Sequence, residues 1–378
     1  MKKIAIITDR IFPEYIGGYE ILLYNISKIL KDEFNVTIFT SMAQKLSYNK
    51  DGIEYYKVSK KRNYLNKRGM HNLKDFMFFE FNLLGEIKYI NKFDLVIINT
   101  IPYFGIPYLL KKIEVKKISL FHEAWFEYLS KFNFLTREVL KNQIANIVKQ
   151  TNFIISVSTK TTISLQENYG ATDIITIPIG IDRIYEEFSE VEREIDVIFV
   201  GRLEKIKHVE TIIKSLKFIK KDFGKANVVV VGNGNMSSKL KRDCINEGVE
   251  KNVIFLDNVD NEEKIRLLKK SKIFVSPSER EGFSISTLEA MANGVVPIVA
   301  VPEFNETFGT SDFVKDGING LYFKLMDEED LALKIRKLLE DKQLYISFQI
   351  KCIEESKKFL WNGITKKYSE VISNLIGK

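Results

Sequence analysis

The sequence contains few cysteines and no long apolar run. Its two cysteines, Cys244 and Cys352, lie far apart and form neither a metal-binding nor a redox spacing, so we expect two reduced thiols in a cytoplasmic protein. No apolar run approaches the about 20 residues that a membrane-spanning helix needs. The first expected strand follows directly on Met1-Lys2-Lys3, which leaves no room for a signal peptide. The prediction is a cytoplasmic protein that is either soluble or peripherally attached to the inner face of the cell membrane.

Glycine is missing from one position where a dinucleotide-binding protein would need it. Gly232 and Gly234 begin a G-x-G-x-x-G pattern, but Ser237 occupies the place of the third glycine. This departure argues against a Rossmann dehydrogenase. No low-complexity tract is present, so the chain has the composition of a globular protein.

What the sequence does contain is enough apolar residues for two domains. Of its 378 residues, 45% are hydrophobic and 28% are charged, and a chain of this length can bury two sizeable cores. Its net charge of +7 suits an anionic ligand or an anionic membrane surface better than duplex DNA, so we expect no nucleic-acid partner.

Strand and helix patterns alternate along the chain, which predicts an α/β protein with two doubly wound parallel sheets. The stretch Ile184–Ile195 is acidic and lacks strong periodicity, so it is the expected linker, with the boundary near Arg183. We therefore expect one domain over residues 1–183 and a second over residues 184–359. The expected strands are Lys3–Thr8, Asn35–Thr40, Ile53–Val58, Asp94–Thr100, Lys117–His122, Phe153–Ser158, Ile174–Ile179, Asp196–Gly201, Asn227–Gly232, Val253–Leu256, Lys272–Pro277 and Val296–Val301.

Helical spacing fills the intervals between these strands. It is clearest over Tyr19–Leu30, Leu135–Lys149 and Thr161–Asn168. Two further helices are expected in the tail, over Ser347–Phe359 and Gly363–Ile376.

Two glutamates flank an expected strand-to-helix turn in the second half. Lys272–Pro277 is a short apolar run ended by proline, and apolar residues then recur at helical spacing from Ile285. Glu281 would lie on the connecting loop and Glu289 about two turns further along, so both can face one crevice at the carboxyl end of the sheet. Ionised carboxylates accept hydrogen bonds from vicinal hydroxyls, such as those of a sugar or a ribose. Taken alone, this spacing would also fit a surface glutamate and an ordinary packing helix.

The start of this helix offers a second kind of contact. Ser284 or Ser286 can cap the helix, and the backbone N–H groups of Gly282, Phe283 and Ser284 would complement a phosphate. Hydroxyl-binding carboxylates beside a phosphate site indicate that a sugar nucleotide binds here.

The strand, the proline, the Glu281-Gly282-Phe283 tripeptide and the Glu289-Ala290-Met291-Ala292 helix together resemble the donor-site motif of retaining GT-B glycosyltransferases of the glycosyl-group-1 type, often called family four. The resemblance implies a GT-B architecture, in which two Rossmann-like domains face each other across a cleft. It also implies transfer of a hexose, with retention and without a metal or other cofactor, from a nucleotide-diphosphate sugar to a hydroxyl acceptor. A UDP-sugar is the expected donor, and a glycan or a lipid-linked glycan is the expected acceptor.

The resemblance assigns roles to individual residues in the second half. Glu281 would hold the sugar hydroxyls, and Glu289 would accept hydrogen bonds from the ribose. Arg202 and Lys207 correspond to the two cations that hold the donor diphosphate, and without the resemblance they would be surface cations of a basic protein. Family members usually have glycine after this lysine, whereas His208 follows here.

In the first half, the resemblance points to the loop after the opening strand. Gly17, Gly18 and Glu20 match the family's G-G-x-E loop, which faces the donor phosphate and the acceptor, while a tight strand-to-helix turn is the alternative. His122 ends an expected strand where the family often has His-Asp near the reacting sugar, although Glu123 replaces the aspartate. A structural histidine is the alternative there.

By the same resemblance, the second domain binds the donor and the first domain binds the acceptor. The last helix, residues 360–378, would return to the first domain. The expected catalytic set is Glu281, His122, Arg202 and Lys207, and the expected donor-binding set is Gly18, Arg202, Lys207, Glu281, Gly282, Phe283, Ser284 and Glu289.

A basic segment runs into an aromatic one between Lys57 and Phe81. Its cations would meet anionic head groups while its aromatic side chains enter the interface, so the segment is a candidate membrane anchor. The alternative is a solvated loop leading into an ordinary amphipathic helix. The residues are Lys60, Lys61, Arg62, Lys67, Arg68 and His71, followed by Phe76, Phe78, Phe79 and Phe81.

Two other functions are compatible with this architecture. A sugar-nucleotide epimerase would need an added acid/base set, which the sequence does not show. A non-catalytic partner subunit would have no physical need for Arg202, Lys207, Glu281 and Glu289 together. The motifs therefore favour a glycosyltransferase.

Overall fold

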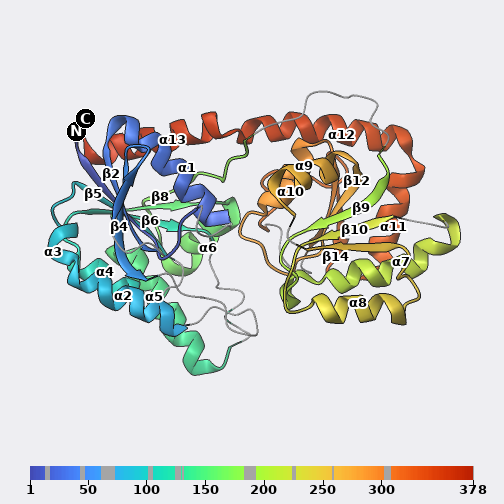
Figure 1. Ribbon diagram of the computed structural model, residues 1–378, viewed down its shortest axis with the longest axis horizontal. Coiled ribbons are helices and arrows are strands. Elements are labelled where there is room, and N and C mark those ends of the chain that lie inside the picture. The colour runs from blue at the N-terminus through green and yellow to red at the C-terminus, as the bar shows by residue number, and fades with distance from the viewer. Residues whose placement is uncertain are drawn as a thin grey trace. The chain divides into compact units, whose positions relative to one another are not determined.

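The computed structural model divides the chain into two compact units (Figure 1). Unit 1 comprises Met1–Asn66, Met70–Gly180 and Trp361–Lys378, and unit 2 comprises Ile181–Leu360. The chain passes from unit 1 to unit 2 between Gly180 and Ile181. The boundary near Arg183 stays a prediction. The structure describes residues 1–12, 18–42, 47–60, 73–100, 105–123, 129, 132–182, 193–223, 227–257, 259–301 and 308–377.

In the described part of unit 1, eight strands form one sheet in the order β3-β4-β2-β1-β5-β6-β7-β8. All neighbouring strands are parallel except β3 and β4. The strands are β1 (Lys3–Ile7), β2 (Asn35–Met42), β3 (Tyr48–Lys50), β4 (Ile53–Lys60), β5 (Leu95–Asn99), β6 (Lys116–Phe121), β7 (Phe153–Ser156) and β8 (Ile174–Thr176). The helices are α1 (Gly18–Glu33), α2 (Leu73–Gly85), α3 (Ile87–Ile90), α4 (Ile106–Lys112), α5 (Phe134–Gln150), α6 (Thr159–Tyr169) and α13 (Trp361–Ile376).

Unit 2 contains a wholly parallel sheet among its described residues, in the order β11-β10-β9-β12-β13-β14. Its strands are β9 (Ile195–Val200), β10 (Val228–Val231), β11 (Val253–Leu256), β12 (Ser271–Ser276), β13 (Val296–Val301) and β14 (Leu321–Lys324). Its helices are α7 (Val209–Phe223), α8 (Ser237–Asn246), α9 (Asn261–Lys269), α10 (Ile285–Ala292), α11 (Glu328–Glu340) and α12 (Lys342–Ser356), with single 3-10 turns at Lys205–Lys207 and Lys357–Phe359.

Every strand expected from the sequence is present, and two short strands were not predicted. β3 pairs antiparallel with β4 through the Asp51-Gly52 turn, in which both residues have positive φ. An Asp-Gly pair is a hairpin signal. β14 adds the other unpredicted strand at the edge of the sheet of unit 2.

The strands of unit 2 are apolar because both faces of the sheet are covered. Val197 and Phe199 of β9 belong to one buried cluster, whereas Ile198 belongs to another, against which Val200 packs. Successive side chains of a strand point to opposite faces, so a strand buried on both faces reads as an unbroken apolar run. This is why Val228–Val231 is four valines in a row.

The last helix, α13, packs within unit 1. Trp361 at its start lies against Gly180, where an added Cβ would come 2.5 Å from the indole ring. Tyr368 is buried, and its hydroxyl donates to the backbone oxygen of Ile177 at 3.4 Å. At the end of the helix, Lys2 Nζ donates to the backbone oxygen of Ile376 at 2.9 Å. The C-terminal helix is therefore a structural part of unit 1.

In each sheet, the carboxyl ends of the parallel strands lie along one edge, where a ligand can bind. β1 lies between β2 and β5 in unit 1, and β9 lies between β10 and β12 in unit 2, so the chain leaves each of these strands at a switch in strand order. Open α/β sheets bind ligands outside the carboxyl ends of strands at such a point. Among the helices that the structure describes, none is long and apolar enough to cross a bilayer.

Candidate functional site

Lys207 and Glu281 meet at the carboxyl edge of the sheet of unit 2. Lys207 ends the 3-10 turn after β9, and Glu281 lies on the loop between β12 and α10. The Lys207 ammonium donates to Glu281 Oε1, which also accepts from Ser278 Oγ at 2.9 Å. A backbone bond from Glu279 N to the oxygen of Ile206, at 3.0 Å, joins the two loops. The structure therefore brings together two of the residues that the sequence analysis selected.

His208 has the backbone conformation that a glycine would favour. Its φ is +44°, in the left-handed region. The imidazole is buried between two carboxylates, with Nδ1 3.5 Å from Glu210 and Nε2 3.4 Å from Glu279. These contacts hold a non-glycine residue in a strained conformation. His208 therefore adopts the backbone conformation that a glycine would have at this position, and the turn that positions Lys207 is preserved.

Arg202 belongs to the same loop but lies apart from the Lys207–Glu281 pair. Its side chain is 58% exposed, and its guanidinium donates to Glu204 at 2.7 Å. An exposed pair of this kind contributes little to stability. The guanidinium can therefore leave Glu204 for a stronger anion.

Two glycines allow the loops around this edge to approach closely. Gly232 has a φ of +137°, and a Cβ there would lie 1.9 Å from the backbone oxygen of Gly201. Gly309 lies against the loop of Glu281, where a Cβ would come 2.3 Å from the backbone oxygen. The G-x-G after β10 is thus a packing feature of this edge.

The start of α10 differs in one detail from the expected cap. Ser284 stands at the N-cap with a φ of +63°, but its side chain caps no backbone N–H. Its Oγ instead lies 2.8 Å from Thr287 Oγ1. The Phe283 ring is buried against Phe313 and Phe359, with ring centroids 5.2 and 5.9 Å away. The ring of Phe283 therefore anchors the loop of Glu281 and Gly282 and is not available to a ligand.

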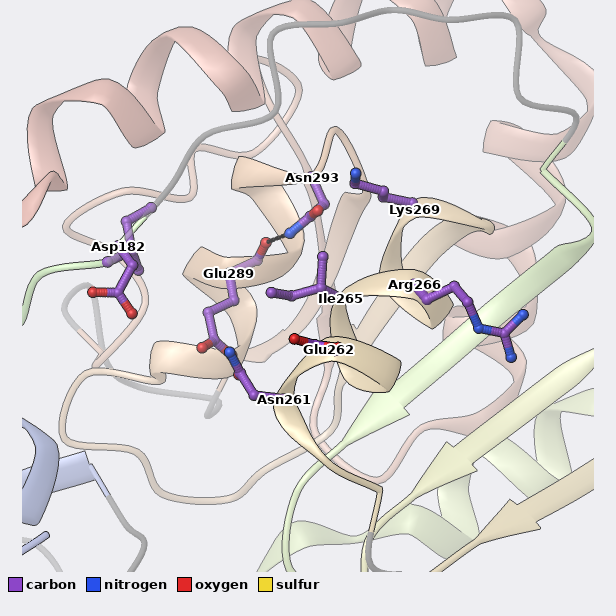
Figure 2. A pocket seen from close by; sticks show the side chains of 9 residues that line it. Asp182, Asn261, Glu262, Ile265, Arg266, Lys269, Glu289 and Asn293 are labelled. Carbon is purple, nitrogen blue, oxygen red and sulfur yellow. Dashed lines mark hydrogen bonds between the residues drawn. The ribbon is translucent and has the colours of Figure 1, made fainter. Parts of the chain in front are cut away.

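Glu289 lines a cavity of about 810 Å³ between α9 and α10 (Figure 2). The view shows Glu289 near Asn261 at the start of α9, while Asn293 donates from Nδ2 to the backbone oxygen of Glu289 at 2.8 Å. Glu281 is not among the described residues that line this cavity, and it lies instead on the loop that contacts Lys207. The described lining residues are Ile181, Asp182, Asn261, Glu262, Ile265, Arg266, Lys269, Glu289 and Asn293.

Lys264 is a site residue that the sequence analysis missed. Its ammonium lies 2.8 Å from both carboxylate oxygens of Glu289, and the two side chains are 20% and 28% exposed. Lys264 follows the start of α9, where Asp260 caps the helix by accepting from the backbone N–H of Glu263 at 2.8 Å. Nothing in the sequence links a lysine on one helix to a glutamate on the next.

In unit 1, Gly18 begins α1 and Glu20 lies in its first turn, while Gly17 falls outside the described residues. Glu20 is only 3% exposed, and its carboxylate lies 3.4 Å from Arg10 Nε. The same guanidinium donates to the hydroxyl of Tyr19. Arg10 therefore ties the end of β1 to the start of α1.

His122 follows β6 and is buried beside Tyr19, with ring centroids 5.4 Å apart. Neither ring nitrogen has a hydrogen-bond partner among the residues that the structure describes. Burial lowers the pKa of His122 to about 3, so the imidazole is neutral. A neutral ring can accept a hydrogen bond at one nitrogen and donate at the other.

Asp9, at the end of β1, was not selected from the sequence. Its carboxyl is buried, and its Oδ2 lies 3.4 Å from Arg10 Nε. Burial raises the pKa of Asp9 to about 7, against the opposing effect of Arg10. A buried ionisable group at a strand end marks a candidate site.

The described residues contain no group of three or more His, Cys, Asp or Glu side chains that could hold a metal ion. The charged residues of unit 2 selected for the candidate site are Arg202, Lys207, Glu281 and the Lys264–Glu289 pair.

The chain resembles known proteins in both sequence and fold. Residues 181–359 match the family described as glycosyl transferases group 1. An uncharacterized glycosyltransferase of Methanocaldococcus jannaschii is 29% identical, with all of both chains covered. Sucrose-phosphate synthase from Thermosynechococcus elongatus matches 99% of both chains, with a TM-score of 0.82 and 17% identity. Anabaena HepE in complex with UDP-glucose matches 99% of this chain and 100% of that chain, with a TM-score of 0.75 and 16% identity.

These two parallel-sheet units define the GT-B fold, as the motifs predicted. Within that fold, unit 2 belongs to the glycosyl transferases group 1 family.

The raised pKa of Asp9 predicts a pH dependence of stability. Between its ordinary pKa near 4 and about 7, the unfolded chain loses the proton while the folded chain keeps it, so the free energy of unfolding falls as pH rises. Asp9→Asn has no carboxyl to titrate. As pH rises from 5 to 8, its free energy of unfolding should therefore increase by on the order of 2 kcal/mol relative to that of wild type. Thermal or urea unfolding of both proteins measures the difference. Asp173→Asn, at an exposed aspartate of the same unit, is the control and should show no such trend. If the difference in the free energy of unfolding between Asp9→Asn and wild type did not change with pH, the raised pKa of Asp9 would be contradicted.

Proposed function

We propose that this protein is a metal-independent, retaining glycosyltransferase that uses a nucleotide-diphosphate sugar, with a UDP-sugar as donor. The observation that carries the proposal is the contact between Lys207 and Glu281 at the carboxyl edge of unit 2, beside the start of α10. A cation for the diphosphate and a carboxylate for the sugar thereby lie side by side. The UDP-glucose complex of Anabaena HepE supports the choice of donor.

The donor diphosphate would replace the present partners of the two cations. Lys207 would leave Glu281, and Arg202 would leave Glu204, because a diphosphate carries more charge than one carboxylate. The N–H groups at the start of α10 add a dipole that favours an anion. These groups stabilise the negative charge that develops on the departing nucleoside diphosphate.

Glu281 would then be free to hold the hydroxyls of the sugar. In the proposed step, the bond between the sugar C1 and the phosphate oxygen breaks, and a bond from C1 to the acceptor oxygen forms on the same face. The proton of the acceptor hydroxyl passes to the departing phosphate oxygen, so the step needs no side-chain base. His122 is neutral and is suited to hydrogen bonding near the reacting sugar.

A donor screen without acceptor separates this proposal from its alternatives. A transferase should slowly hydrolyse its own donor to sugar and UDP. An epimerase should release a second UDP-sugar, and a non-catalytic subunit should bind without any product. Chromatography of each reaction over a panel of sugar nucleotides distinguishes the three results.

The first prediction is that donor turnover persists in excess EDTA. Arg202→Ala should lower kcat by roughly a hundredfold, equivalent to about 3 kcal/mol, because one donor to the developing charge is lost. Lys205→Ala, at an exposed lysine of the same turn, is the matched control and should stay near wild type. Activity that EDTA abolishes and that only magnesium or manganese restores would refute the proposal.

The second prediction separates the two glutamates and assigns a positioning role to Lys264. Glu289→Gln should weaken UDP binding by about 1.5–3 kcal/mol, whereas Glu281→Gln should impair turnover and leave UDP binding near normal. Wild type should also prefer UDP over 2′-deoxy-UDP. Since Lys264 fixes the Glu289 carboxylate, Lys264→Met should reduce this preference and Lys264→Arg should retain it.

Calorimetry with UDP and 2′-deoxy-UDP measures both effects. Lys272→Met is the matched control, because Lys272 forms a 2.7 Å ion pair with Asp196 elsewhere in unit 2. Equal loss of UDP affinity in Glu281→Gln and Glu289→Gln would contradict the division of roles. An unchanged preference for UDP in Lys264→Met would contradict the role of Lys264.

We further propose that unit 1 attaches to an anionic membrane, with a lipid-linked glycan as acceptor. Of the segment selected from the sequence, residues 61–72 lie outside the described residues, and Phe79 is buried in the core. Exposed apolar side chains do lie on helices α2, α4 and α5, of which α4 contacts both of the others and which Figure 1 shows close together. They are Met77, Phe78, Phe81, Tyr108, Phe134, Leu135 and Val139.

The third prediction is binding to anionic vesicles that weakens with salt. Each basic residue near such a surface contributes about 1 kcal/mol. Changing Lys60, Lys61, Arg62, Lys67 and Arg68 to Gln, or Phe78 and Phe81 to Ser, should abolish co-sedimentation. Leu333→Ser, at an exposed leucine of unit 2, is the control. If wild type ignores lipid charge, or if both variants still bind, the acceptor does not lie at a membrane.

A further inference from the structure

His208 is a buried titratable side chain that the proposed reaction does not use. It directly follows the Lys205–Lys207 turn, it is 7% exposed, and its φ of +44° is costly for a residue with a Cβ. A glycine would adopt the same backbone without this strain. The histidine side chain must therefore make contacts that offset the cost and that a glycine could not make.

The imidazole of His208 joins two loops of unit 2. Its Nε2 lies 3.4 Å from Glu279 on the loop after β12, and its Nδ1 lies 3.5 Å from Glu210 in the first turn of α7. The backbone N–H of Glu279 also donates to the oxygen of Ile206 at 3.0 Å, and the intervening residue, Lys207, contacts the same loop. His208 thus continues the set of contacts that holds the turn against the loop after β12.

Whether the ring can bind both carboxylates depends on its charge. An imidazolium has an N–H at each nitrogen and can donate to both carboxylates at once. A neutral imidazole has one N–H, so its second nitrogen faces a carboxylate as acceptor against acceptor. Histidine changes its charge between about pH 5 and pH 8. The contact between the two loops is therefore complete when the ring is protonated and incomplete when it is neutral.

Other charged groups surround this contact. Burial alone would raise the pKa of Glu210, but hydrogen bonds from His208 and from the backbone lower it, so Glu210 is ionised at neutral pH. Lys239 of α8 acts on Glu210 in the same direction and itself forms a 2.7 Å ion pair with Asp243. Among the described residues, the charged groups on the turn, on α7 and α8 and on the loop after β12 near His208 are Glu204, Lys205, Lys207, Glu210, Lys239, Glu279, Arg280 and Glu281.

We infer that His208 is a positioning residue for donor binding, which fastens the Lys207 turn to the loop after β12 when its ring is protonated. The inference rests on the proposed function, in which Lys207 binds the donor diphosphate, and it adds a pH dependence to that binding. With a neutral ring, the turn holds Lys207 in place for a smaller fraction of the time, so the observed affinity falls. The glycine that is usual at this position would provide the turn without the pH dependence.

The experiment measures UDP binding to the full chain by calorimetry at pH 5.5 and pH 8.5. The terminal phosphate of UDP itself titrates near pH 6, so each variant is compared with wild type at the same pH. His208→Asn tolerates the left-handed backbone and can donate to one carboxylate, but it does not titrate. Its Kd for UDP should be about tenfold that of wild type at pH 5.5, because one charge-assisted hydrogen bond is missing, and within about twofold at pH 8.5.

Three further variants separate the charge of the ring from the shape of the turn. Glu279→Gln can donate to a neutral ring, so its affinity should be about tenfold below that of wild type at pH 5.5 and near wild type at pH 8.5. His208→Gly keeps the turn and should bind UDP at pH 8.5 within about threefold of wild type. His71→Gln, at another histidine, should follow wild type at both pH values. Far-UV circular dichroism and thermal unfolding report whether each variant is folded.

The inference is overturned if the ratio of the Kd of His208→Asn to that of wild type is the same at both pH values, or if Glu279→Gln keeps the pH dependence of wild type. Loss of UDP binding by His208→Gly at pH 8.5 would also overturn it, because the side chain would then be needed without its charge. In each of these cases, UDP binding by wild type leaves the proposed function standing. Wild type that binds no UDP at either pH would refute the proposed function and this inference with it.

Discussion

The register between β9 and β12 is the constraint on which the site of unit 2 depends. These strands run parallel, with Ile273 opposite Val197 and Phe274 opposite Ile198, so their loops leave the sheet at one edge. The backbone bond from Glu279 to Ile206 then fixes one loop against the other. A change of one residue in this register would turn every side chain of the slipped strand to the other face and separate the two loops.

The polar side chains of the two units differ in whether they already have partners. In unit 2, Lys207 and Arg202 already have carboxylate partners, so an anionic ligand would exchange one partner for another, and the side chains are held before it binds. In unit 1, the acceptor atoms of Asp9, Asn99 and His122 have no hydrogen-bond partner among the described residues. An exchange of partners favours a strongly charged ligand.

The sequence predicted the two sheets because their strands are unbroken apolar runs. It pointed to Glu281 through the strand-to-helix turn after such a run, and to Lys207 through the family resemblance. Lys264 and Asp9 were not predictable in this way. The role of Lys264 depends on how α9 packs against α10, and that of Asp9 depends on burial, which a local pattern does not reveal. The left-handed backbone of His208 likewise depends on contacts with Glu210 and Glu279 from other elements.

Because α13 completes unit 1, the order of synthesis differs from the order of folding. Domains generally fold as units while the chain leaves the ribosome. Unit 2 ends at Leu360 and can close before the last helix has been made. Unit 1 must wait for Trp361 and Tyr368, although most of its sheet was synthesised first. Its apolar surface beside α1 therefore remains uncovered until α13 has been made, and a chain cut before α13 would expose it permanently.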